Sequence, residues 1–131
     1  MAFADLKVGQ SAERTKVMTE ALVNAYAELT GDFSPVHVDE AAAAKTRFGT
    51  RIAHCMLSAG FLSAVIGMDL PGPGTIWVKQ EFRFKQAVKL GDTITWRVEV
   101  RKPIKIATSF PAIVEKPSTR QGPIAIRQIA A

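Results

Sequence analysis

The chain has 131 residues, of which 47% are hydrophobic and 22% are charged, and its formal net charge is +5. This length suffices for one domain with a sizeable core and is short for two, so we expect a single domain over residues 1–131. No stretch approaches the roughly 18 apolar residues that a membrane span requires. The first residues show no basic segment followed by an apolar run. We therefore expect a cytoplasmic protein with no membrane partner.

The positive charge favours anionic partners, among which nucleic acid is the first to consider. The Lys and Arg residues are scattered, however, and aromatic residues are not interleaved with them as in single-strand binding proteins. We expect no nucleic-acid partner, and a phosphate-bearing small molecule or carrier fits the charge equally well. With one cysteine, Cys55, and two histidines, the chain offers no credible zinc ligand set, so we expect no metal.

The first half of the chain predicts helices. Residues 15–19 could form a short strand, and residues 19–32 then form a helix with Thr19 as N-cap and Gly31 just beyond its end. Its apolar positions follow helical spacing: Leu22, Val23, Tyr26 and Leu29. Residues 32–39 are expected to be a turn around Pro35.

Asp39 is the expected N-cap of a second, alanine-rich helix over residues 39–48. From Cys55 to Met68 nearly every residue is apolar or small, which predicts a helix buried on most sides. The Pro and Gly residues of the stretch LPGPG, residues 70–74, end it.

The second half predicts strands. Residues 75–85 and 92–100 both alternate apolar and polar side chains, with a turn at Gly91 between them. The apolar sets are Ile76, Val78, Phe82 and Phe84 in the first strand, and Ile94, Trp96, Val98 and Val100 in the second. Residues 104–114 and 122–130 are weaker candidates because of their prolines. A curved antiparallel sheet wrapped around a buried helix, an α+β architecture, accommodates this pattern.

The stretch AELTGDFSPVHVDEAAAAKTRFGTRIAHCMLSAG, residues 27–60, resembles the signature region of the MaoC-like (R)-specific enoyl-CoA hydratases. The later stretch PGPGTIWVKQEFRFKQAVKLGD is similar to a strand, turn and strand of that family. The glycine that the family usually has after the second histidine is Cys55 here. The resemblance implies one MaoC-like hotdog domain over residues 1–131, a homodimer, and hydration of trans-2-enoyl thioesters without a cofactor.

Adding water across such a double bond requires a group that deprotonates the water, a proton for C2, and a donor to the thioester oxygen. The resemblance places Asp32 and His37 at the catalytic positions, where together they would hold one water. It places the oxyanion donor at the backbone N–H of Cys55, at the start of a helix. An aspartate after a helix-ending glycine is, taken alone, often only a turn residue.

Other residues near these positions have structural explanations beside functional ones. His54 is expected to cap or hydrogen-bond at the helix start. The thiol of Cys55 could be a nucleophile, since helix N-termini lower thiol pKa values. We expect the substrate to contact residues that also have roles in the turn or core: Ser34, Met56, Leu57 and Ser63.

The expected substrate is an acyl-CoA or acyl-carrier thioester, whose phosphates could attract Lys79, Arg83 or Lys85. A hotdog thioesterase is the alternative enzyme, although such enzymes usually place a carboxylate on the central helix and residues 55–67 contain none. A non-catalytic acyl-thioester-binding subunit of a dehydratase is the alternative outside catalysis.

Overall fold

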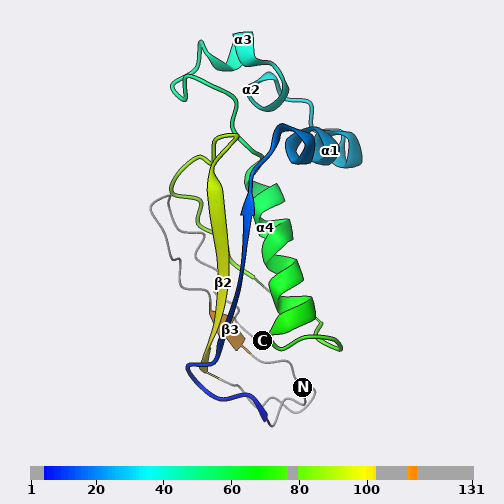
Figure 1. Ribbon diagram of the computed structural model, residues 1–131, viewed down its shortest axis with the longest axis vertical. Coiled ribbons are helices and arrows are strands. Elements are labelled where there is room, and N and C mark those ends of the chain that lie inside the picture. Colours follow the sequence, from blue (N-terminus) through cyan, green and yellow to red (C-terminus); the bar gives the residue numbers. More distant parts are fainter. Residues whose placement is uncertain (1–4, 77–79, 103–111, 115–131) are drawn as a thin grey trace.

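The computed structural model describes residues 5–76, 80–102 and 112–114 (Figure 1). Its sheet is antiparallel and runs in the order β1-β2-β3. The strands are β1 (Ser11–Val17), β2 (Thr93–Lys102) and β3 (Ala112–Val114). β1 pairs with β2 along its whole length, from Ser11 opposite Glu99 to Val17 opposite Thr93.

The alternating pattern of residues 92–100 is confirmed by β2, in which the apolar side chains are buried and the intervening ones are partly exposed. The turn before β2 is also confirmed, with Gly91 at φ 92°, a value that glycine adopts without a steric penalty. This turn is held to the end of β1, because Gly91 N–H donates to the Met18 carbonyl and Met18 N–H donates to the Asp92 carbonyl.

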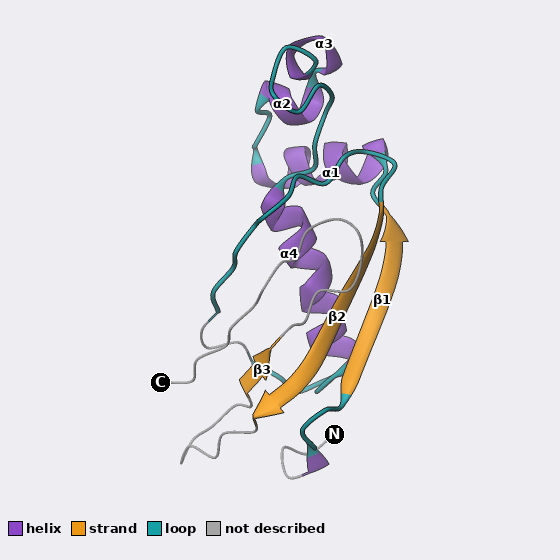
Figure 2. Ribbon diagram, turned by 90° about the vertical axis from the view of Figure 1, so that its left-hand side faces the viewer, coloured by secondary structure: helices purple, strands orange, loops and turns teal. Residues whose placement is uncertain are grey.

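The long apolar segment forms α4 (Cys55–Ala64) and continues as a π-helical turn, η2 (Val65–Asp69). Figure 2 shows α4 crossing one face of the sheet. The main core lies between them, in a cluster that includes Met18, Val23, Leu62, Val65, Trp96 and Val98. The prediction of a helix buried on most sides is wrong in part. Only one side of α4 faces the sheet, and Met56 and Met68 are 48% and 63% exposed.

Three further helices gather at the N-terminal end of α4 (Figure 1). They are α1 (Glu20–Thr30), α2 (Pro35–Val38) and α3 (Glu40–Ala43). The predicted α1 is confirmed: the Thr19 hydroxyl accepts from Leu22 N–H, and Gly31 ends the helix at φ 80°. The prediction that Leu29 lies on the apolar face is wrong. The buried positions are Val23 and Ala27, one turn apart, and Leu29 projects away from them with 84% exposure.

The segment predicted as a turn contains one turn of helix, α2. Pro35 occupies its first position, where a fixed φ favours helix and the missing N–H costs nothing. Asp39 is confirmed as the N-cap of α3, because its carboxylate accepts from Ala42 N–H.

The strand predicted over residues 75–85 is absent from its described part. Glu81 and Phe84 make single bridges rather than a ladder, and Ile76 is 61% exposed. Residues 77–79 of that segment lie outside the described residues. So do residues 104–111 of the strand predicted over 104–114, and all of the strand predicted over 122–130. The remaining residues of the first of these two predicted strands, 112–114, form β3. None of the helices in the described ranges has the length and apolarity to cross a membrane.

Candidate active site

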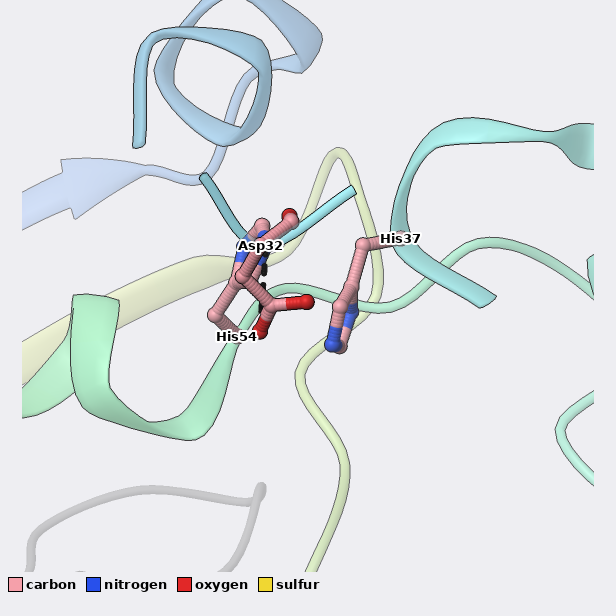
Figure 3. Close-up of side chains that lie close together, drawn as sticks. All are labelled: Asp32, His37 and His54. Carbon is pink, nitrogen blue, oxygen red and sulfur yellow. Dashed lines mark hydrogen bonds and ion pairs between the residues drawn. The ribbon is translucent and has the colours of Figure 1, made fainter. Parts of the chain in front are cut away.

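Asp32, His37 and His54 come together at the N-terminal end of α4 (Figure 3). Asp32 follows the glycine that ends α1, His37 lies on α2, and His54 is the N-cap residue of α4. One atom of each residue, a carboxylate oxygen of Asp32 and one ring nitrogen of each histidine, lies within 4.8 Å of the other two. The structure thus brings together the two residues that the sequence singled out as an acid/base pair, and adds a second imidazole.

Hydrogen bonds to backbone carbonyls define the tautomer of each ring, because a carbonyl oxygen can only accept. His37 Nδ1 lies 2.8 Å from the Ile52 oxygen, so Nδ1 carries the proton and Nε2 has a free lone pair. His54 Nε2 lies 2.9 Å from the backbone oxygen of Asp32, so its proton is on Nε2. These two nitrogens cannot ligate a metal while they donate, which leaves His37 Nε2, His54 Nδ1 and the Asp32 carboxylate as the atoms that could accept a proton or hold an ion.

The carboxylate of Asp32 is half exposed and has one oxygen available. Its Oδ1 accepts from Ser34 N–H at 3.2 Å, while Oδ2 lies 3.9 Å from His54 Nε2, beyond hydrogen-bond distance. Asp32 therefore stabilises the turn through Oδ1, and its Oδ2 can still accept a hydrogen bond from a water. A structural role and a catalytic role are compatible here.

His54 is buried and holds the Asp32 segment in place. Its ring contacts those of Tyr26 and His37, with centroid distances of 4.6 Å and 3.9 Å. The expectation that it hydrogen-bonds at the helix start is confirmed, whereas its side chain makes no capping bond to α4. Among the described residues its Nδ1 has no hydrogen-bond partner.

Cys55 is the first residue of α4. The first N–H groups of a helix have no intrahelical acceptor. Among the described residues, no backbone or side-chain oxygen accepts a hydrogen bond from the Cys55 N–H. Apart from the contact with its own thiol, this amide lies without a helical acceptor at the start of α4, the kind of position from which an oxyanion donor acts.

The thiol of Cys55 is poorly suited to be a nucleophile. The residue is exposed as a whole, yet the surrounding protein desolvates the thiol enough to raise its pKa, and the hydrogen bond from its own N–H offsets only part of that. Because the thiolate is the reactive form, a raised pKa lowers the reactivity of the group at neutral pH. This contradicts the lowered pKa that its place at a helix start suggested.

The four residues expected to contact the substrate differ in their exposure and in their distance from the start of α4. Ser34 contributes its N–H to Asp32, and its hydroxyl makes no cap bond to α2. Met56 is exposed beside Cys55, and Leu57 is partly buried against the core. Ser63 is exposed and lies eight residues after Cys55, about 12 Å along the helix axis.

Of the basic residues expected to attract phosphates, Arg83 is exposed and pairs with Glu81, and Lys85 is exposed. Lys79 lies outside the described residues.

Sequence reasoning missed Tyr26, Arg51 and Ser58. Helical spacing places Tyr26 on the apolar face of α1 and does not predict that its ring contacts His54. Arg51 is buried and donates to the backbone carbonyl of His37. The hydroxyl of Ser58 is buried one turn into α4 and has no partner among the described residues. A single sequence carries no periodic signal for such residues, because their roles arise from tertiary contacts.

The model of the MaoC-like domain matches residues 4–121 of this chain. The chain belongs to the MaoC-like family. An (R)-specific enoyl-CoA hydratase from Rhodospirillum rubrum is 52% identical over 98 residues, which cover 75% of this chain and 68% of that protein. One from Aeromonas caviae is 42% identical over 114 residues, covering 83% of this chain and 85% of that protein.

Solved structures of this family agree with the fold described above. The (R)-hydratase from A. caviae involved in PHA biosynthesis superposes with a TM-score of 0.83 at 36% identity, covering 94% of this chain and 92% of that chain. The expected α+β hotdog fold is thereby confirmed.

Proposed function

We propose that this chain catalyses the (R)-specific hydration of trans-2-enoyl-CoA and the reverse dehydration, with one water held between Asp32 and His37. The observation that carries the proposal is the convergence of the Asp32 carboxylate with the His37 ring at the N-terminal end of α4, where Cys55 is the first helical residue. The names of the relatives above, which are hydratases of this stereochemistry, support it.

The tautomer of His37 suits it to accept a proton. With Nδ1 donating to Ile52, the free lone pair of Nε2 can take a proton from the water as its oxygen bonds to C3 of the substrate. Oδ2 of Asp32 accepts the second hydrogen of the water and orients it. A proton then reaches C2 from the same pair, so that hydroxyl and hydrogen add to one face.

The charge that develops on the thioester oxygen needs a donor during this step. The N–H of Cys55, at the positive end of α4, is the donor that we propose. All the groups in this scheme are side chains and amides of the chain, so the reaction as written uses neither metal nor cofactor. Ser34, Met56, Leu57 and Ser63 remain candidate substrate contacts.

We further propose that two copies of the chain form a homodimer. Large apolar side chains are exposed along α4, η2 and the segment that follows. They are Met56, Met68, Ile76 and Phe84, each at least 40% exposed. A second copy covering them would complete the burial that the sequence of α4 predicts. Met68→Glu should then shift sedimentation toward the monomer, and a monomeric wild type would refute the proposal.

The test of the hydratase proposal is the loss of conjugated-thioester absorbance when crotonyl-CoA is added. Asp32→Asn and His37→Gln should abolish turnover while leaving the circular dichroism spectrum unchanged. Asp92→Asn is the matched control, because among the described residues its side chain accepts only from Lys89 N–H, in the turn before β2. Full turnover in both site variants would sink the assignment. Release of free CoA thiol would point to a thioesterase, and inertness toward enoyl thioesters of all chain lengths and carriers to a binding subunit.

A further inference from the structure

Arg51 is the one charged side chain that the structure buries among the described residues, with 7% of the residue exposed. It lies between α3 and α4, three residues before His54. Burying a guanidinium away from water is unfavourable unless its N–H groups are all met by acceptors. The position of Arg51 therefore depends on what surrounds it.

The guanidinium donates to three separate acceptors. Its Nε lies 2.6 Å from the backbone oxygen of His37. Its two terminal nitrogens lie 2.7 Å from a Glu20 carboxylate oxygen and 2.8 Å from the Asn24 side-chain oxygen. Glu20 and Asn24 are one turn apart on α1. A planar fork with several fixed donors thus joins the body of α1 to the backbone of the residue that carries the imidazole.

The backbone next to Arg51 also binds α2, the helix that carries His37. Ile52 N–H donates to the Val36 oxygen at 3.2 Å, and the Ile52 oxygen accepts from His37 Nδ1 at 2.8 Å. Glu40 of α3 accepts from Thr50 Oγ1 and from Arg51 N–H. Both the ring and the carbonyl of His37 are consequently bound to residues 51–52, and the side chain of Arg51 ties that unit to α1 through two hydrogen bonds.

We propose that Arg51 is a positioning residue for the hydration step, acting through His37. By fixing the His37 carbonyl, it keeps the ring within reach of Ile52, which maintains the Nδ1–H tautomer and leaves the Nε2 lone pair facing the water. Arg51 does not touch the reacting atoms. The proposal rests on the proposed function for its catalytic consequence, while its structural part can be measured without turnover.

The kinetic test is Arg51→Lys, with Arg14→Lys as the matched control. Lysine keeps the charge but cannot reach three acceptors in a fixed plane. We expect kcat for crotonyl-CoA to fall roughly 10- to 100-fold, the range that a misplaced catalytic group produces, with little change in KM. Arg14 forms an exposed bidentate pair with Asp69 on η2, so its substitution should leave kcat unchanged.

The second readout is the tautomer of His37, measured by long-range proton–nitrogen NMR of the imidazoles. The chain has only two histidines, and His54→Gln assigns the spectrum. We expect the Nδ1–H form of His37 in the wild type and a mixture with the Nε2–H form in Arg51→Lys. The wild-type spectrum can be measured even if the variant fails to fold. An Nε2–H form of His37 in the wild type would overturn the proposal.

The two readouts separate the failure of this proposal from that of the proposed function. A folded Arg51→Lys protein with unchanged kcat and an unchanged His37 tautomer overturns the positioning role. A changed tautomer in a protein whose wild type hydrates no enoyl thioester supports the positioning of His37 and removes the hydratase proposal. A loss of kcat without any change of tautomer overturns the proposed route through His37.

Discussion

Cys55→Pro would remove the proposed oxyanion donor and leave the helix intact. Proline is common at the first helical position, where its missing N–H had no intrahelical acceptor and its φ is already suitable. Proline also requires an extended residue before it. His54 has φ −60° and ψ 134°, which meets that requirement. The substitution therefore deletes one N–H group, with little reason for the backbone to move.

The size of the expected effect follows from the role of this amide. If the Cys55 N–H binds the thioester oxygen as negative charge develops on it, its loss should lower kcat by about 10²–10³, equivalent to ~2.7–4 kcal/mol of transition-state stabilisation. Because the bond strengthens only in the transition state, kcat and kcat/KM should fall together. The thiol contributes nothing to this estimate.

The assay is hydration of crotonyl-CoA by Cys55→Pro beside Cys55→Ala, which also lacks the thiol but keeps the N–H. Cys55→Gly is a second control that restores the residue usual in the family. Thermal unfolding monitored by circular dichroism verifies that all three are folded. A folded Cys55→Pro protein that turns over as fast as Cys55→Ala would refute the assignment of the oxyanion donor.

The remaining predictions concern stability and reactivity. Leu62 is fully buried and Leu29 is 84% exposed. In urea unfolding, Leu62→Ala should lower the free energy of unfolding by about 2–5 kcal/mol, and Leu29→Ala should change it by no more than about 0.5 kcal/mol. Equal losses in the two variants would contradict the core described here. Hydrogen bonds from the Arg14 guanidinium hold the pKa of Asp69 below its usual value, so its stabilising contribution is present above the unfolded pKa of about 3.9 and is lost as pH falls through the folded pKa. Asp69→Asn should accordingly lower Tm at pH 7 and progressively less on acidification, whereas a pH-independent difference would contradict the pairing. Burial raises the pKa of the Cys55 thiol, so iodoacetamide should label it more slowly at pH 7 in the folded chain than in urea, and faster labelling of the folded chain would contradict that shift.

Local signals in the sequence were enough to predict several elements. Thr19 and Gly31 bracket α1 because capping depends on nearby backbone groups. The alternation that ends at Val100 predicts β2 because one face of that strand meets the core. The convergence of Asp32 with His37 was predictable because a short turn separates them, and the structure brings them together.

The features that the sequence did not reveal depend on contacts between distant segments. Arg51 is recognisable as a buried anchor only once α1 is packed beside it. The exposure of Met68 contradicts its apolar surroundings in sequence, because the sheet covers one side of the helix only. The alternation around Phe82 predicts a strand, but an alternating segment forms one only where a neighbouring strand pairs with it, and the described residues supply no such ladder. The extent of the domain, residues 1–131, stays a prediction.

The configuration of the alcohol formed from crotonyl-CoA tests the central claim most directly. The purified chain should convert it to (R)-3-hydroxybutyryl-CoA, and in deuterated water the new C2–D bond should lie on the same face as the hydroxyl, because Asp32 and His37 act on one side of the double bond. An (S)-alcohol, a racemic product or anti addition would contradict a single water held between these two side chains.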